Sequence, residues 1–393
     1  MAIKVFIIVN ELLRGGAQRI ILDYACAANK NDFELHVVTL KAEDVFPPES
    51  KTLLNDLLKT GAHVHSIGGR ARFEFDEFKR LLKLFKREKP DIIHTYLPYA
   101  GTLGRIAGRL AGVKVIISTQ CNLPAAYSFK VYWLDKITLL LAHTWIGATE
   151  GIELAYGGGV SSRFSNDLWK QGRRHYTIVA GVDAQHILQA KSAVDRDAKR
   201  LSIGIVQNQV LILMTARLIS WKGHHEMIRM MEFLPLEYHI AFAGWGPIED
   251  ELKTLAVNSG VADRVHFLGA REDIYELLAA ADFYIQAFSI LKNQSVWVGP
   301  NTAMIEAAAA GLPVVASAVP LVEKLIEDGI TGKTAEVGNP QAHAQALLWY
   351  VQHPSEIPGI VMAAQKRVDD FYTIQAMARQ LESLYHVVVQ CND

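Results

Sequence analysis

Short apolar runs rich in β-branched residues alternate with longer helical patterns along almost the whole chain. This alternation limits the fold more than any other feature. In the first half, the predicted strands are residues 4–9, 34–40, 91–94 and 113–118, and the predicted helices are 17–28, 75–87 and 104–110. The strand runs are apolar on both sides, as expected where helices cover both faces of a parallel sheet. The pattern predicts an α/β fold of doubly wound units.

The same order starts again near residue 210, after a charged stretch at 167–208 that lacks clear periodicity except at residues 176–179. The predicted strands of this second series are residues 210–214, 238–243, 265–268, 282–285 and 313–316. With 393 residues, the chain is long enough for two domains. We expect two Rossmann-like domains facing each other across a cleft, at residues 1–182 and 183–370, and a C-terminal helix at 371–393 that crosses back to the first domain.

Charge and cysteine content exclude several classes of protein. The 40 Lys and Arg residues balance 41 Asp and Glu residues, which argues against a nucleic-acid partner and against an acidic disordered chain. Three widely spaced cysteines fit neither a disulfide framework nor a zinc ribbon. Neither of the longest apolar stretches has the roughly 20 residues that a membrane-spanning helix needs. We therefore expect a cytoplasmic protein.

Two strand-to-helix turns carry residues suited to binding a phosphate. Gly15 and Gly16 follow the first strand and open a helix, where backbone amides can approach an anion. This pair lacks the third glycine of the dinucleotide fingerprint, so a plain tight turn is an equal interpretation. Arg217 and Lys222 follow the strand at 210–214 and precede a helix. Ligands bind at that edge of an open α/β sheet, and two cations there would stabilise a departing diphosphate.

Two further segments of the second half have residues typical of ligand contacts. Gly244 and Gly246 lie in another strand-to-helix turn, where a backbone can approach a ligand closely. Glu306 lies early in an Ala-rich helix that packing must bury, and a buried carboxylate needs a partner. A ribose diol would supply two hydrogen bonds to it, whereas a solvent-facing helix acid is the alternative.

Taken in order, these motifs resemble glycosyltransferase family 4, the retaining GT-B enzymes that use nucleotide sugars. The resemblance spans nearly the whole chain and also includes residues 91–94, 265–269 and 328–332. It implies a GT-B architecture and transfer of a hexose-type sugar from a nucleotide diphosphate sugar to an acceptor hydroxyl, in cell-surface glycan or glycoconjugate biosynthesis. It implies no cofactor and no bound metal. The acceptor would be a glycan, a lipid-linked sugar or a small molecule.

Family roles transfer position by position. Arg217 and Lys222 match the pair that stabilises the leaving diphosphate. The implied donor-binding residues are Gly15, Gly16, Gly244, Ala270, Arg271, Thr302, Ala303 and Glu306. The implied sugar or acceptor contacts are Cys121, Asn122, Val298 and Gly299. His94 ends a predicted strand at the cleft edge and is a further candidate contact, although a hydrogen-bonded structural histidine is the favoured alternative. In such enzymes the acceptor is thought to attack from the face that the diphosphate leaves, so the reaction depends on leaving-group stabilisation.

Three substitutions and one insertion depart from the family pattern around the implied cleft. Val298 stands where the family has its first glutamate, Cys121 stands near the usual histidine, and the linker at residues 179–183 begins with Val-Ala instead of Pro-Asn. Residues 288–294 also resemble an insertion. These departures leave two alternatives: a sugar-nucleotide-binding protein with weak or lost activity, and a nucleotide-sugar epimerase. The epimerase would need acid–base carboxylates, one of which Val298 removes.

A basic helix predicted at residues 78–87 places cations beside an apolar stripe. The stripe can pack on the first sheet or contact anionic lipid at the inner face of a membrane. The sequence leaves both interpretations open.

Overall fold

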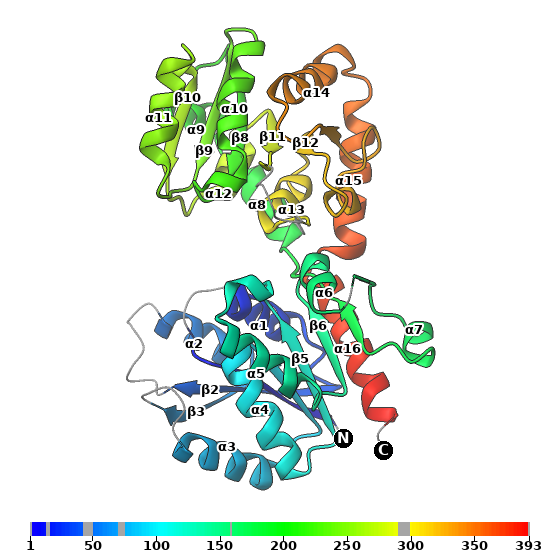
Figure 1. Cartoon of the computed structure of the whole chain (residues 1–393). Helices are drawn as coiled ribbons and strands as arrows, with labels where there is room; N and C mark the ends of the chain where they lie inside the picture. Colours follow the sequence, from blue (N-terminus) through cyan, green and yellow to red (C-terminus); the bar gives the residue numbers. More distant parts are fainter. Residues whose placement is uncertain are drawn as a thin grey trace. The chain divides into compact units, whose positions relative to one another are not determined.

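The computed structural model describes residues 2–12, 16–41, 50–69, 75–157, 159–289 and 299–391. It divides the chain into two compact units (Figure 1): unit 1 contains residues 1–181 and 374–393, and unit 2 contains residues 182–373. Each unit is a doubly wound α/β domain built on one parallel sheet.

Unit 1 has a seven-stranded sheet in the order β3-β2-β1-β4-β5-β6-β7. The strands are β1 (Ile3–Val9), β2 (Phe33–Lys41), β3 (His63–Gly69), β4 (Ile92–Tyr96), β5 (Val115–Gln120), β6 (Thr144–Gly147) and β7 (His175–Thr177). The helices are α1 (Gly16–Ala27), α2 (Ser50–Lys59), α3 (Phe75–Glu88), α4 (Pro98–Ala111), α5 (Phe129–Leu139), α6 (Glu150–Tyr156), α7 (Asn166–Lys170) and, from the C-terminus, α16 (Ile374–Gln390).

Helices cover both faces of this sheet, which explains why its strands are apolar on both sides. Val5, Ile7 and Val9 of β1 belong to the buried cluster that includes side chains of α1 and α16. Phe6 and Ile8, which point the other way, belong to the cluster with α3 and α4. Successive side chains of a strand alternate between faces, so a two-sided cover requires an unbroken apolar run.

Unit 2 has a six-stranded sheet in the order β10-β9-β8-β11-β12-β13. The strands are β8 (Val210–Thr215), β9 (Tyr238–Ala243), β10 (Val265–Gly269), β11 (Phe283–Gln286), β12 (Val314–Ser317) and β13 (Lys333–Ala335). The helices are α8 (Ala184–Ala193), α9 (Arg196–Ser202), α10 (His224–Met230), α11 (Glu249–Asn258), α12 (Ile274–Ala280), α13 (Thr302–Ala309), α14 (Pro340–Gln352) and α15 (Ile357–Phe371).

The strand order of each sheet reverses at one place. In unit 1 this place lies between β1 and β4, and in unit 2 it lies between β8 and β11. Loops that leave neighbouring strands in opposite directions open a crevice at the carboxyl ends of the strands, which is where open α/β sheets bind ligands. The reversal in unit 2 lies directly beside the loop that carries Arg217 and Lys222.

Helices long and apolar enough to cross a bilayer are absent from the part of the chain that the structure describes.

Candidate functional site

The loop that follows β8 is held in place by the loop that follows β9. The amide of Ala216 donates to the carbonyl of Ala243 (3.2 Å), and that of Leu218 donates to the carbonyl of Trp245 (3.0 Å). A Cβ on Gly244 would lie 1.9 Å from the Ala216 oxygen, and one on Gly246 would lie 2.1 Å from the Leu218 oxygen. Both positions therefore need glycine, and their close approach fixes the backbone on either side of Arg217.

Arg217 is exposed, and its guanidinium carbon lies 5.5 Å from the centre of the Trp245 ring. Within the described ranges it has no carboxylate partner. Contact with the aromatic ring limits the conformations of the arginine side chain and leaves its N–H groups available as hydrogen-bond donors. The side chain can therefore donate to an anion at the carboxyl edge of the sheet.

Lys222 is half-buried at the reversal of the strand order. Its ammonium lies 4.1 Å from the Trp221 ring centre and 5.5 Å from that of Phe288, which follows β11. Gly223, at φ 75°, allows this approach, because a Cβ there would lie 2.6 Å from Cβ of Ala287. Burial lowers the pKa of Lys222 to about 8. No acid among the described residues pairs with it, so its charge is compensated only by aromatic rings.

A chain of buried polar groups joins the carboxyl ends of β8 and β11 to the start of α13. The hydroxyls of Thr215 and Tyr284 lie 3.1 Å apart, and the Tyr284 hydroxyl donates to Oε1 of Gln286 (3.2 Å). Asn301 donates its Nδ2 to the same Gln286 oxygen (3.0 Å) and accepts from the Met304 amide at Oδ1 (2.8 Å). Asn301 thereby caps α13. The prediction missed this residue, although an asparagine three residues before a helical amide is a recognisable cap signal.

The network positions the three predicted residues of α13. Thr302 is exposed in the first turn, and Ala303 and Glu306 are half-buried. The Tyr275 hydroxyl of α12 lies 3.4 Å from Oε1 of Glu306. The Glu306 carboxylate is thus half-buried and fixed by a tyrosine from a neighbouring helix.

Ala270 and Arg271 follow β10, whose Gly269 carbonyl accepts from the Gly244 amide (2.8 Å). Arg271 donates its Nε and Nη2 to the two carboxylate oxygens of Asp273 (2.7 and 2.5 Å). This bidentate pair holds the pKa of Asp273 well below its usual range. Because the Arg271 side chain is already engaged, backbone groups are what this segment offers a ligand.

The residues of unit 1 that were predicted as ligand contacts differ in their exposure to solvent. Gly16 begins α1 and is exposed. Cys121 is half-buried, and burial raises the pKa of its thiol to about 12, so it is not a reactive thiolate at neutral pH. Asn122 is exposed and donates Nδ2 to the Tyr127 hydroxyl (2.9 Å). Gly299 in unit 2 is half-buried, whereas Gly15 and Val298 lie outside the described residues.

His94, which was predicted as a candidate sugar or acceptor contact, lies in the core of unit 1. It has no exposed surface, and its Nδ1 and Nε2 lie 2.6 Å from the Tyr385 hydroxyl and 2.7 Å from the Thr119 hydroxyl. Burial lowers its pKa to about 3, so the ring is neutral. His94 therefore joins β4 and β5 to α16 and has no nitrogen left for a ligand, which is the structural role that the sequence favoured over a ligand contact.

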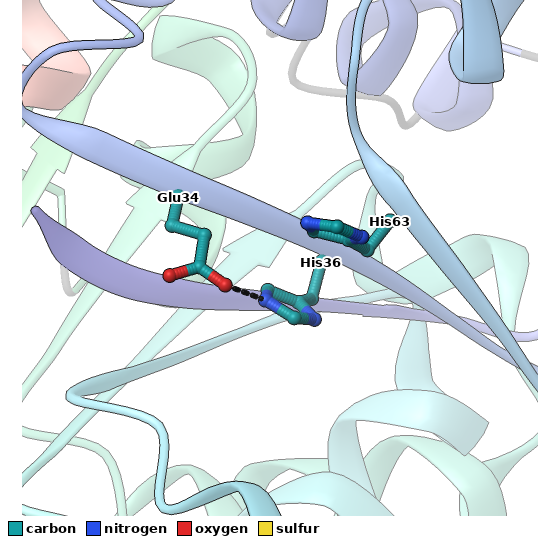
Figure 2. Close-up of side chains that lie close together, drawn as sticks. All are labelled: Glu34, His36 and His63. Atoms are coloured by element: carbon teal, nitrogen blue, oxygen red, sulfur yellow. Dashed lines mark hydrogen bonds and ion pairs between the residues drawn. The ribbon is translucent and has the colours of Figure 1, made fainter.

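A separate group of side chains in unit 1 has donors of the kind that bind metals. Glu34, His36 and His63 each place one such atom within 4.8 Å of the others (Figure 2). Both nitrogens of the buried His36 are already engaged, since Nε2 lies 2.8 Å from Glu34 and Nδ1 lies 2.8 Å from Nε2 of His65. These hydrogen bonds explain the spacing, and the group lies near the amino ends of β2 and β3, not at the edge where parallel sheets bind ligands.

Comparison with known proteins adds two family matches. Residues 14–150 match the model described as Glycosyltransferase Family 4, and residues 209–353 match the one described as Glycosyl transferases group 1. Among solved structures, HepE of Anabaena in complex with UDP superposes with a TM-score of 0.76 at 19% identity, covering 98% of this chain and 99% of that one. This similarity shows the GT-B fold.

Curated relatives include two bacterial enzymes. The amylovoran biosynthesis glycosyltransferase AmsK of Erwinia amylovora is 29% identical over 55% of this chain, which spans about half (54%) of that protein. A UDP-Gal:alpha-D-GlcNAc-diphosphoundecaprenol alpha-1,3-galactosyltransferase of Escherichia coli is 25% identical over 68% of each chain. Since both units match glycosyltransferase models in the order found along the chain, the protein belongs to the GT-B glycosyltransferases of family 4, as a divergent member.

Proposed function

We propose that unit 2 binds the diphosphate of a nucleotide sugar with Lys222 and Arg217. The observation that carries this proposal is Lys222, whose half-buried ammonium has no anionic partner in the described parts of the chain. Partial burial of an uncompensated cation costs free energy, and a bound diphosphate would offset that cost. Arg217 would donate to the same group from its place on Trp245.

The remaining predicted residues of unit 2 would bind the nucleoside. Glu306 would accept hydrogen bonds from the ribose hydroxyls, and the backbone at Ala270 and Arg271 would contact the base. The amides at Thr302 and Ala303 would meet the diphosphate at the start of α13. UDP is the first nucleotide to test, because HepE was crystallised with it.

The proposed reaction transfers a hexose with retention of configuration. The bond between the anomeric carbon and the diphosphate oxygen breaks, and the acceptor oxygen forms a new bond on the same face. The acceptor proton passes to the departing phosphate oxygen, so atoms and charge balance. Lys222 and Arg217 would hold the charge that develops on the leaving group, a task for which preorganised cations are well suited.

The acceptor is proposed to be a glycan or a lipid-linked sugar used in building a cell-surface polysaccharide. The names of the relatives support this choice, because one acts in amylovoran biosynthesis and another on a diphosphoundecaprenol-linked sugar. Such an acceptor would place the protein at the inner face of a membrane.

The test combines binding and turnover. We expect UDP or a UDP-sugar to raise the melting temperature of the wild type, since a ligand that binds only the folded state stabilises it by mass action. Lys222→Met should abolish the shift. The matched control is Lys253→Met, which removes a lysine paired with Glu249 (2.7 Å) on the surface of α11. Equal shifts in both variants would refute the assignment of Lys222.

Assays of turnover with UDP-, GDP- and ADP-sugars then separate the remaining alternatives. Transfer or slow hydrolysis that retains the anomeric configuration is the expected result. Tight binding without turnover would indicate a sugar-nucleotide-binding protein, and inversion of a sugar carbon without transfer would indicate an epimerase.

A further inference from the structure

Helix α5 of unit 1 exposes most of its apolar side chains and its lysines and buries two polar side chains instead. Its two buried side chains are Asp135 and Thr138. Four of its exposed apolar residues are named here the α5 stripe: Phe129, Trp133, Ile137 and Leu140, which follows the last turn, whereas the exposed Val131 and Leu134 lie elsewhere on the helix. Phe129 and Leu140 are exposed by 76% and 84%. Their spacing of four, four and three residues places them on one side of the helix.

The orientation of α5 is fixed by ionic and polar contacts with α4. Nη2 of the buried Arg105 donates to Oδ1 of Asp135 (2.6 Å) and to the Thr138 hydroxyl (2.7 Å). Rolling the helix to cover the stripe would pull Asp135 away from this buried cation. The exposure of the stripe is therefore a stable property of unit 1.

The exposed acidic and basic side chains of the segment that carries the stripe, residues 121–149, have one sign. Asp135 is the only acidic residue between positions 121 and 149, and its charge is paired. Lys130 and Lys136 are exposed, and at about 3.6 residues per turn they fall on the two sides of the stripe. The Lys136 ammonium lies 5.5 and 5.6 Å from the ring centres of Tyr132 and Trp133. Aromatic rings and lysines around an apolar stripe are typical of a helix in the interface of a bilayer.

The contrast with α3, the basic helix first considered for lipid contact, supports this assignment. Leu81, Leu84 and Phe85 of α3 are buried in the core of unit 1. Its cations remain exposed, but its apolar stripe is already covered. Lipid contact through that stripe is excluded by its packing.

We propose that the α5 stripe docks on an anionic lipid surface, with Phe129, Trp133, Ile137 and Leu140 in the acyl boundary and Lys130 and Lys136 at the headgroups. A second copy of the chain is a poorer occupant, because a symmetric pairing of two such helices would oppose lysines with lysines and offers no exposed carboxylate between them. The α5 segment begins soon after Cys121 and Asn122, at the carboxyl end of β5. Docking there would bring a lipid-linked acceptor to that edge, a consequence that rests on the proposed function.

The experiment measures cosedimentation of the full chain with vesicles of phosphatidylglycerol and phosphatidylcholine, and with vesicles of phosphatidylcholine alone. We expect binding to the mixed vesicles that weakens with salt. The variant Phe129→Ser/Ile137→Ser/Leu140→Ser should weaken it by about tenfold or more. The matched control, Leu201→Ser/Leu236→Ser/Val257→Ser, removes three comparably exposed apolar residues of unit 2 and should bind like the wild type.

Two further variants test the parts of the proposal. Lys130→Glu/Lys136→Glu should lose binding to the anionic vesicles several-fold. Trp133, which the triple serine variant retains, reports insertion into the bilayer. In the wild type its fluorescence should shift to the blue when mixed vesicles are added. Trp133→Phe should remove that shift. A melting temperature close to that of the wild type shows that each variant is folded.

The proposal would be overturned if the wild type cosedimented with neither kind of vesicle. It would also be overturned if the triple serine variant of the stripe bound the mixed vesicles as well as the control variant. A dimer in analytical ultracentrifugation that the stripe variant abolishes would assign the face to a second copy instead. The stabilisation by UDP described above should be the same in every α5 variant. Loss of vesicle binding with UDP binding intact separates this inference from the donor assignment.

Discussion

Arg105 of unit 1 and Lys222 of unit 2 are both cations withdrawn from water, but only the charge of Arg105 is neutralised by an acidic partner among the described residues. Arg105 in unit 1 has no exposed surface and is neutralised by Asp135, with further bonds to Ser118 (2.7 Å) and Thr138. Lys222 in unit 2 is half-buried, and burial lowers its pKa to about 8. No acid of the described chain faces it.

The difference shows what each charge is for. A cation that the fold neutralises holds two helices together and is not available to a ligand. A cation that the fold leaves uncompensated raises the free energy of the empty protein, and its cost is offset only when an anion arrives. On this basis we expect Arg105 to affect stability and Lys222 to affect turnover.

The largest effect is expected from breaking the paired charge. Arg105→Met leaves Asp135 buried without its partner and should lower the free energy of unfolding by about 3–5 kcal/mol. Urea unfolding followed by far-UV circular dichroism measures this loss. Arg109→Met is the control, because that exposed arginine of the same helix makes a single bond to a backbone carbonyl. Equal stability of the two variants would contradict the structural role of Arg105.

Lys222→Met should show the reverse pattern. We expect kcat to fall about 100-fold or more, because a preorganised positive charge near the leaving group is lost. The free energy of unfolding should stay the same or rise, since an uncompensated charge is removed. A drop in stability without a change in kcat would show that the comparison between the two cations is wrong.

The pKa of Lys222 gives a dependence on pH that sharpens the same contrast. The protonated ammonium binds the diphosphate, so kcat/KM should be steady below about pH 8 and should fall as the pH rises above it. Lys222→Arg should move this fall to higher pH, because a guanidinium stays protonated. A profile that is unchanged in this variant would indicate that another group titrates.

Two of the buried histidines, His94 and His224, should make the free energy of unfolding depend on pH. Burial lowers the pKa of both His94 and His224 to about 3, below the value near 6.5 of an unfolded chain. The unfolded state therefore binds more protons between these values, and stability should fall as the pH decreases from about 6.5 toward 3. Urea unfolding at several pH values measures this slope.

Replacing each histidine by leucine should affect the stability of the two units differently. His94→Leu removes the hydrogen-bond partner of the Tyr385 hydroxyl and one partner of the Thr119 hydroxyl, and should cost about 1–3 kcal/mol at neutral pH. Both nitrogens of His224 lack a partner among the described residues, so His224→Leu should be neutral or stabilising. Either variant should also reduce the dependence of stability on pH, and an unchanged slope in both would refute the linkage.

Much of the fold was predictable because its strands are covered on both faces. The apolar runs at residues 4–9 and 238–243 correspond to β1 and β9, and they are unbroken for the same reason. The stretch at 167–208 was predicted to lack clear periodicity except at 176–179, which overlaps β7, and it also contains α7, α8 and α9. Helices α7 and α9 span only five and seven residues, and α8 buries a single side chain, Ile187, so none of the three shows a clear apolar period.

The candidate site was predicted in part, and the reason lies in the distance between partners. Arg217 and Lys222 follow one strand, so their place at the carboxyl edge depends on local order alone. His94 was predicted at the same kind of edge, but a tyrosine 291 positions later in the chain binds its ring. Nothing local to His94 in the sequence signals that partner.

The sequence by itself determined the two parallel sheets and the family, because periodicity and motif order are visible over short stretches. It predicted Gly244 and Gly246 only as a close approach to a ligand, whereas the structure packs them against the loop that follows β8. Only the tertiary structure determined which charged side chains are neutralised by an ion pair and which lack such a partner among the described residues. Arg105 and Asp135 are 30 positions apart and meet through the packing of α4 on α5, while the Lys222 ammonium lies against aromatic rings and pairs with no acid of the residues that the structure describes. The same packing turned the apolar side of α5 outward, since an ion pair can fix a helix in an orientation that its hydrophobicity alone would not choose.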